Sequence, residues 1–239
     1  MFGSKKEKVK RGFWAEVRSL AGIAVVVLLL RTFVFQPFTI PSGSMEPGLI
    51  EGDYIIVSKF ATGYGRHAAW PLPFPAQKDR FLKRGVDRGD VIVFRPDGLN
   101  KDYIKRVIGL PGDEVEVRNG AVYINGSKVQ QVEGGEILDG REYRTQLLTG
   151  GRAPGAPDGV FSVPPKSYFV LGDNRDDSLD SRVAVSTDPY VTSGAGLVPS
   201  VGIVGEAKFV LLSVKPEFEL FKPWTWHHIR GDRWFKGIQ

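Results

Sequence analysis

Apolar residues form one long run near the start of the chain and only short, alternating segments after it. The run covers residues 20–30, LAGIAVVVLLL, and a second apolar triplet follows at residues 33–35. Eleven residues alone are too few to cross a bilayer, which takes about twenty. The window 13–35 is long enough if Arg18 and Arg31 reach toward opposite interfaces. We therefore predict a single transmembrane helix over residues 13–35.

Two other interpretations of this run are a cleaved signal peptide and a buried core helix. A basic segment precedes the run, as in a signal peptide, but the bulky residues 33–38, FVFQPF, offer no small-x-small cleavage site. Lysine and arginine are absent from residues 32–58, whereas they crowd residues 5–11. This asymmetry predicts a basic cytoplasmic tail over residues 1–12 and places the chain beyond about residue 36 outside the cytoplasmic membrane.

The rest of the chain predicts a mainly β fold. Short β-branched and aromatic segments end at Gly, Pro or Asp, and Asn119-Gly120 is a strong hairpin signal. The predicted strands are residues 53–57, 90–94, 103–108, 114–118, 121–124, 168–171 and 201–214. We predict an antiparallel β-sheet catalytic domain over residues 36–112 and 166–239. A smaller β subdomain is inserted at residues 113–165, with residues 133–160 mostly loop, and residues 61–87 form a long loop or β-extension.

Composition narrows the chemistry. The 29 glycines and 16 prolines agree with many turns, and the absence of cysteine excludes disulfides, thiolate catalysis and zinc–thiolate sites. With only three histidines in the chain, serine is the expected nucleophile and lysine a plausible base. The net charge of +5 is concentrated in part at the N-terminus, which indicates membrane topology and not nucleic-acid binding.

Ser44 and Lys105 are the candidates for this chemistry. Ser44 follows Gly43, which lets the backbone bend and leaves space for a substrate carbonyl, although most such serines lie in solvated turns. Lys105 shares a strand face with Tyr103 and Val107 if residues 103–108 are extended. To act as a base it must be neutral near pH 7, which costs roughly 4.6 kcal/mol relative to a reference pKa near 10.4. Burial among apolar neighbours can supply a shift of that size.

A third segment, residues 171–182, reads LGDNRDDSLDSR. Its charge could belong to a solvated loop or to a calcium loop, but no glycine stands at the sixth position from Asp173, as a calcium loop requires. A salt-bridged corner that orients polar side chains is a further interpretation.

Taken together and in order, PSGSM at residues 41–45, YIKRVIGLPGD at 103–113 and GDNRDDSLDSR at 172–182, behind an apolar anchor, resemble the type I signal peptidases. The resemblance runs from the anchor to about Lys208. This family consists of membrane-bound serine–lysine endopeptidases that remove leader peptides from exported proteins after small-x-small sites. It implies preproteins and the lipid bilayer as partners, a monomer, and neither a cofactor nor a metal.

The resemblance also implies roles for individual residues. Ser44 is the nucleophile, Lys105 the general base, and the Ser42 hydroxyl joins the Ser44 backbone N–H in an oxyanion hole. Ser178 forms a hydrogen bond with the lysine amine and orients it. Three further residues support the site, namely Asp180 and Arg182 as an ion pair and Asp173 as a structural acid. Shallow pockets for small leader side chains are lined by Phe38, Ile40, Met45, Tyr103 and Ile104.

One departure and two alternatives complete the sequence picture. In the family, Gly-x-Val-Pro follows Ser-Arg within a few residues, but here residues 196–199 come only after the extra segment 183–195. A self-cleaving repressor-type protease shares the serine–lysine chemistry, but residues 1–40 are too short and too apolar for a DNA-binding module. An inactive membrane-tethered binding protein of the same fold would have lost Ser44 or Lys105, and both are present.

Overall fold

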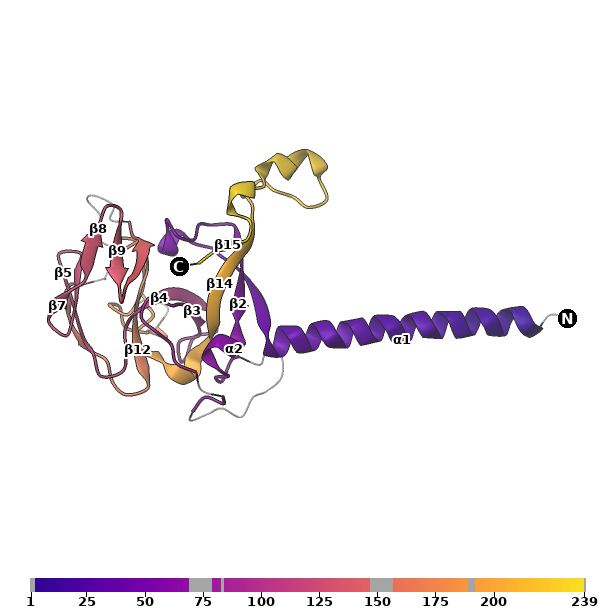
Figure 1. The fold of residues 1–239 in the computed structure, drawn as a ribbon, viewed down its shortest axis with the longest axis horizontal. Helices are drawn as coiled ribbons and strands as arrows, with labels where there is room; N and C mark the ends of the chain where they lie inside the picture. The colour runs from indigo at the N-terminus through magenta and orange to yellow at the C-terminus, as the bar shows by residue number, and fades with distance from the viewer. Residues whose placement is uncertain (1–2, 69–78, 83, 147–156, 189–191, 239) are drawn as a thin grey trace.

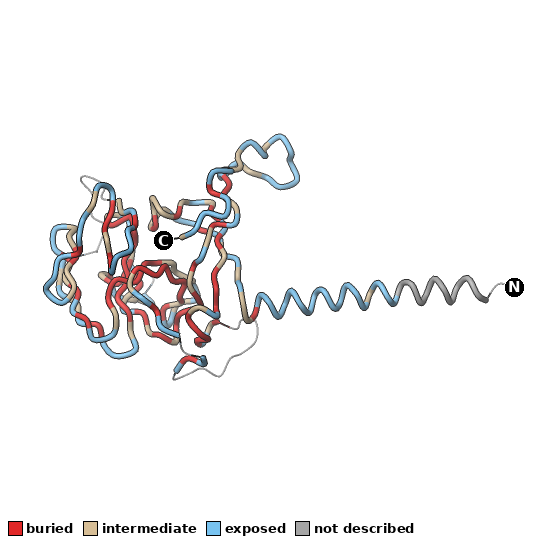
Figure 2. The backbone as a smooth tube through the Cα atoms, viewed as in Figure 1, coloured by how far each residue is buried: buried red, intermediate tan, exposed pale blue. Residues whose placement is uncertain are grey.

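A long helix projects from a β-rich body (Figure 1). The computed structural model describes residues 3–68, 79–82, 84–146, 157–188 and 192–238, with side chains from residue 14 onward. Helix α1 spans Gly3–Phe33, and its exposed surface continues up to the point where it meets the body (Figure 2). Within the described residues, no helical stretch has the length and apolar character that a membrane crossing requires. The predicted transmembrane span over residues 13–35 is therefore helical as far as Phe33 but not confirmed as a span.

The body is built around an antiparallel sheet that includes the strands predicted near residues 53–57, 90–94, 103–108, 168–171 and 201–214. Its strand order is β1-β2-β14-β3-β4-β12-β13, and β15 pairs with β14 off this path. The strands are β1 (Phe35–Thr39), β2 (Asp53–Ser58), β3 (Val91–Phe94), β4 (Tyr103–Gly109), β12 (Ser167–Leu171), β13 (Val198–Pro199), β14 (Ile203–Ser213) and β15 (Lys236–Gly237). The mainly β, antiparallel prediction is confirmed, because the mixture of β-branched residues and turn residues suits short paired strands.

Two separate clusters of apolar side chains use the pleat of β3 and β4. Val91 and Val93 enter one cluster together with Ile40, Met45 and Leu49. The alternate positions of the same strands, including Ile92 and Val107, enter another. Neighbouring residues of one strand therefore serve different sides of the sheet, as the period of two requires.

Two smaller sheets lie in the inserted part of the chain. One has the order β11-β5-β6-β7 and the other β10-β9-β8. Their strands are β5 (Glu114–Arg118), β6 (Ala121–Ile124), β7 (Ser127–Lys128), β8 (Gln130–Val132), β9 (Gly135–Leu138), β10 (Arg141–Arg144) and β11 (Gly159–Ser162). The predicted hairpin at Asn119-Gly120 is confirmed, since both residues have the positive φ, 50° and 77°, of a type I′ turn.

The expectation that residues 133–160 are mostly loop is wrong where the structure describes them. Strands β9 and β10 pair across Asp139-Gly140, whose φ angles of 49° and 80° make another tight turn. This Asp-Gly signal is of the same kind as Asn119-Gly120, but the surrounding glycines and charges obscured it. Residues 147–156 lie outside the described part.

Short helices and bridges connect the strands. They are η1 (Gly43–Met45), α2 (Lys59–Thr62), η2 (Ser200–Gly202), η3 (Pro223–His228) and η4 (Gly231–Arg233). In the predicted β-extension at 61–87, Tyr64 and Phe81 form an antiparallel bridge, while residues 69–78 and 83 lie outside the description. The two ends of the extra segment 183–195 lie side by side. Gly194 N donates a hydrogen bond to Ala184 O, and Gly196 N donates one to Val183 O.

Candidate active site

Ser44 lies in the middle of η1, within the segment that joins β1 to β2. Two apolar side chains of this segment are buried in the core, with Met45 0% and Leu49 2% exposed. Backbone hydrogen bonds tie its ends together, from Ile40 N to Asp53 O and from Gly52 N to Ile40 O. Ser44 itself stays half-buried, so its hydroxyl sits on a rigid turn that remains open to a substrate.

Lys105 reaches this serine from β4. Its side chain is buried, with the residue 4% exposed, and its Nζ lies 2.7 Å from Ser44 Oγ. Burial lowers the pKa of Lys105 to about 8, against the carboxylates of Asp180 and Asp173, which raise it. A buried amine at hydrogen-bonding distance from a serine hydroxyl has the geometry of a base and its nucleophile.

The loop 172–182 packs against the backbone of the serine. Asn174 N donates to Ser44 O over 3.2 Å, and Asn174 Nδ2 donates to Gly43 O over 3.3 Å. Gly172 lies where the two segments are closest. A Cβ atom there would stand 2.2 Å from Ser178 Oγ and 2.5 Å from Ser44 O, so no larger residue fits. The loop therefore determines where the serine backbone sits.

Buried ion pairs stiffen this loop. Asp180 and Arg182 pair at 2.8 Å, as the resemblance implies. Asp173, only 1% exposed, accepts two hydrogen bonds of 2.7 Å from Arg106 on β4. Arg175 forms a two-pronged pair with Glu136 on β9, at 2.9 and 2.6 Å. Two-pronged pairs of this kind resist rotation as well as separation.

Ser178 does not make the hydrogen bond that the resemblance implies, and Ser42 lies two residues before Ser44. Ser178 is 1% exposed, and its Oγ has no hydrogen-bond partner among the described residues. The expected hydrogen bond from Ser178 to the Lys105 amine is therefore absent from this structure. Ser42 is exposed at the start of η1, and its side chain makes no capping hydrogen bond there.

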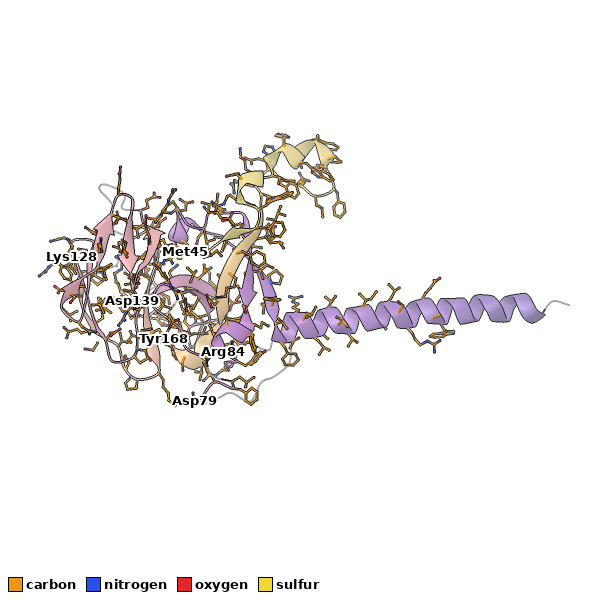
Figure 3. The ribbon with its side chains drawn as sticks, in the orientation of Figure 1. Met45, Asp79, Arg84, Lys128, Asp139 and Tyr168 are labelled. Atoms are coloured by element: carbon orange, nitrogen blue, oxygen red, sulfur yellow. The ribbon has the colours of Figure 1, made fainter. Side chains whose placement is uncertain are left out.

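Four of the five residues predicted to line leader pockets gather in one apolar cluster. Ile40 and Met45 belong to its buried part, and Phe38 and Ile104 pack against it. Tyr103 instead packs on the other cluster, where its ring stacks 6.0 Å from that of Phe94. A cavity of about 470 Å³ opens beside Met45, the last residue of η1, which is labelled in Figure 3. Its lining includes Leu49, Val91, Arg106, Tyr143 and Asp173.

Comparison with known proteins decides the family. The family model described as "Signal peptidase, peptidase S26" matches residues 14–212. The chain belongs to the signal peptidase family. A signal peptidase I of Rickettsia felis (strain ATCC VR-1525 / URRWXCal2) is 36% identical over 235 residues, covering 89% of this chain and 83% of the relative. A signal peptidase I of Rickettsia akari (strain Hartford) is 37% identical over 229 residues, covering 86% and 80%.

A crystal structure of a signal peptidase I from Enterococcus faecalis V583 is also similar, at 29% sequence identity. It aligns with a TM-score of 0.35 and covers 52% of this chain and 97% of that one. The family match and the Rickettsia relatives confirm the predicted activity, a serine endopeptidase that removes signal peptides.

Sequence reasoning about this signal peptidase missed Arg106, Asn174 and Glu136. Arg106 follows Lys105 in the chain, is 2% exposed and pairs with Asp173. A buried arginine needs a carboxylate, and the acidic loop 173–180 was a visible signal for one. Nothing in the sequence pairs Glu136 with that loop, because the inserted strands could pack in many ways. Within the described ranges, no group of three or more His, Asp or Glu side chains could hold a metal ion.

Proposed function

We propose that this signal peptidase is membrane-bound and cleaves preproteins by acyl transfer to Ser44, with Lys105 as general base. The observation that carries the proposal is the 2.7 Å distance from Lys105 Nζ to Ser44 Oγ in a buried setting. Serine without an adjacent base is a weak nucleophile, so the neighbour of its hydroxyl decides whether it can react.

In the first half of the reaction, neutral Lys105 takes the proton of Ser44 Oγ while that oxygen attacks the scissile carbonyl. The tetrahedral intermediate collapses to an ester as the C–N bond breaks, and the Lys105 ammonium returns the proton to the leaving amine. In the second half, Lys105 takes a proton from water, which attacks the ester. Breakdown of that intermediate gives the proton back to Ser44 Oγ and releases the leader as its carboxylate.

The developing oxyanion needs donors that are in place before the reaction. We assign this role to the Ser44 backbone N–H and the Ser42 hydroxyl. Support comes from the exposed position of Ser42 next to η1 and from the absence of a capping bond that would occupy its side chain. Ser178 is assigned an orienting role toward Lys105. Its buried hydroxyl, without a partner among the described residues, is available to a lysine that moves during turnover.

Around this pair, Asp173, Asp180 and Arg182 support the loop. Burial supplies the neutral amine that the mechanism needs. A pKa of about 8 for Lys105 leaves a useful fraction of the amine neutral near pH 7.5 and corresponds to roughly 3 kcal/mol of differential stabilisation.

The leader is proposed to bind in an extended conformation. Strand β1 stands at one end of the sheet order, so its outer edge can accept another strand. Phe38, Ile40, Met45, Tyr103 and Ile104 are assigned to the pockets, and four of them share one apolar cluster. We assign the catalytic domain to residues 36–112 and 166–239 and the inserted subdomain to residues 113–165.

Membrane binding is proposed from the apolar side chains of α1. Leu20 is 65% and Ile23 58% exposed, and the residues between 20 and 30 are exposed on every side of the helix. Such a helix is not stable in water without a cover, and lipid provides one. Exposed Phe221 and Trp224 at the tip before and within η3 suit the membrane–water interface. We propose a monomer in the cytoplasmic membrane with residues 1–12 cytoplasmic and the catalytic domain outside.

The test is to incubate the purified protein in detergent with a precursor that carries an Ala-x-Ala site and to identify the cut ends by mass spectrometry. Wild type should cut after the second alanine, and Ser44→Ala should not. Ser127→Ala, which changes an exposed serine on β7, is the matched control and should cut normally. Cleavage that survives in Ser44→Ala would remove this serine from the mechanism.

A further inference from the structure

The C-terminal end of α1 is fully capped by the β-rich body. The last carbonyl groups of a helix have no partner within the helix and must find one elsewhere. Val34 N donates to Leu30 O over 2.8 Å, and Lys59 Nζ donates to Arg31 O and Thr32 O over 2.9 and 3.2 Å. The Tyr64 hydroxyl donates to Phe33 O. All four terminal carbonyls therefore have donors, and three of these bonds come from side chains of the body.

Lys59 is the centre of this cap. It is the first residue of α2, it is 0% exposed, and it is the largest fully buried side chain of the described residues. Burial, together with the smaller effect of the nearby Arg31 charge, lowers its pKa to about 8. The amine keeps two N–H donors even when it is neutral, which is enough for two carbonyl groups. Burying a lysine costs free energy, so the cap must provide something that an apolar residue would not.

The cap is attached to the sheet and not to a loose loop. Lys59 N donates to Val34 O over 3.0 Å, which ties the start of α2 to the connection after α1. At the other end of α2, buried Arg80 donates to Thr62 Oγ1 over 2.8 Å, to Gly63 O, and to Ser200 O beside η2. The ring of Phe33 meets that of Tyr64 edge-on at 6.2 Å. Helix, cap and sheet therefore form one connected set of contacts.

The connection itself leaves little room for a hinge. Strand β1 begins at Phe35, two residues after α1 ends at Phe33. Along the rest of the described helix the side chains are exposed or half-buried, and Thr32, in the last turn, is 1% exposed. The direction in which α1 leaves the body (Figure 1) is thus decided at the cap.

We propose that Lys59, with Tyr64, locks α1 to the catalytic sheet and thereby fixes how Ser44 meets substrates that are held in the same bilayer. This inference rests on the proposed function, because it gives α1 the role of the membrane anchor. Lys59 is a positioning residue: it touches neither the substrate nor the reacting atoms. A preprotein in the bilayer presents its cleavage site at a fixed height, whereas a short peptide in solution can approach from any direction.

Because α1 is long, a small change of its angle at the cap moves its far end by a large distance. Its 31 residues extend for about 46 Å at 1.5 Å per residue. A swing of about 10° at the cap therefore moves the far end by roughly 8 Å. Misplacement of reacting groups by about 1 Å can reduce a rate by about a hundredfold, so a loosened anchor should slow the processing of bilayer-held substrates.

The first experiment compares two substrates for each variant. Lys59→Met keeps the length of the side chain and removes its donors. With a soluble peptide that carries the cleavage site, kcat/KM should stay within about twofold of wild type, and with a preprotein in the same proteoliposomes it should fall about tenfold. Lys128→Met, on the side of the body farthest from α1 (Figure 3), should change neither. An equal loss with both substrates, or no loss with either, overturns the proposal.

The second experiment measures the lock directly and does not depend on activity. The chain has no cysteine, so two introduced cysteines can carry spin labels without background. With spin labels at Ala24→Cys on α1 and Lys208→Cys on β14, pulsed electron paramagnetic resonance in nanodiscs should give a narrow distribution of label-to-label distances. The distribution should broaden in Lys59→Met and, to a smaller extent, in Tyr64→Phe. A broad distribution in the parent protein overturns the lock, as does a narrow one in both variants.

The two experiments separate failure of the lock from failure of the proposed function. If the wild-type protein does not cut the soluble peptide, the assignment of Ser44 and Lys105 fails, and the distance measurement still decides whether α1 is locked. If the peptide is cut and the label distances are unchanged in the variants, the lock fails alone. A melting curve of each variant shows whether Lys59→Met folds, and Tyr64→Phe provides the milder change if it does not.

Discussion

Lys59 and Lys105 are two buried lysines with similar basicity and different neighbours. They are 0% and 4% exposed, and burial is the main cause that lowers the pKa of each to about 8. Lys59 Nζ faces the backbone carbonyls of Arg31 and Thr32. Lys105 Nζ faces the hydroxyl of Ser44. A search for lysines of lowered pKa would select both.

The difference teaches that burial prepares a lysine for catalysis but its partner decides whether it can act. A carbonyl oxygen can only accept a hydrogen bond, so Lys59 has no proton to take from its neighbours. A serine hydroxyl can give up its proton and become the attacking oxygen. The charged surroundings differ as well. Arg31 adds positive charge near Lys59, whereas Asp180 and Asp173 stand near Lys105 and favour its ammonium form.

The two lysines should differ most in their effect on the cleavage of a soluble peptide when each is replaced in turn. Lys105→Met should lower kcat/KM by about a thousandfold or more, because it removes the base from a unit that acts together. Lys59→Met should change the same quantity by no more than about twofold, since its contacts lie at the helix end. Steady-state kinetics on both purified variants measure this. Comparable losses in the two variants would erase the distinction between them.

Ser178 offers a second contrast, with Ser181 in the same loop. Ser178→Ala should lower kcat by about 10- to 100-fold with little effect on the melting temperature, because its hydroxyl has no partner to lose among the described residues. Ser181 Oγ donates to Gly196 O and accepts from Val170 N. Ser181→Ala should therefore melt earlier, at nearly normal kcat. Normal turnover in Ser178→Ala would refute its orienting role.

The pH dependence of peptide cleavage follows from the pKa of Lys105. The base acts in its neutral form, so kcat/KM should rise with pH through about 8 and level off above it. Well below pH 8 it should fall by about tenfold per unit. Because the equally shifted Lys59 plays no part in the chemistry, Lys59→Met should show the same profile. A profile that is flat from pH 6 to 9 would contradict a lysine base.

Tyr64→Phe tests the smallest contribution to the cap. The change keeps the ring against Phe33 and removes the hydroxyl that donates to Phe33 O. One lost hydrogen bond should cost about 1 kcal/mol of unfolding free energy, or about 2–4 °C in melting temperature for a chain of this size. Differential scanning calorimetry measures this, and peptide cleavage should be unchanged. A loss of cleavage would connect the cap to the chemistry and weaken the comparison.

Much of the candidate site could be predicted from local sequence. The three motifs, taken in order, carry the family resemblance, and that resemblance points to Ser44, Lys105 and the loop 172–182. The tight turns at Asn119-Gly120 were equally readable, since positive φ angles favour Asn and Gly over most other residues. The Asp139-Gly140 turn could have been found by the same rule.

Other parts could not be predicted from local patterns. The pairing of Arg106 with Asp173 joins residues 67 positions apart. The pairing of Arg175 with Glu136 joins the loop 172–182 to strand β9. No hydrophobic pattern in the sequence specifies how these two segments pack. The hydrogen bond expected between Ser178 and Lys105 is absent, although both residues are buried, because a shared environment does not set the distance between two side-chain atoms.

The sequence by itself determined the family resemblance and the mainly β class of this protein, because short motifs, alternation and turn residues act over a few neighbours at a time. Only the tertiary structure decided which buried lysine meets a hydroxyl and which one caps a helix. Lys59 and Lys105 both lie among apolar and β-branched residues in the chain. The physical reason is that hydrogen-bond partners 28 and 61 residues away are selected by the packing of whole strands and a helix, which no short window of sequence contains.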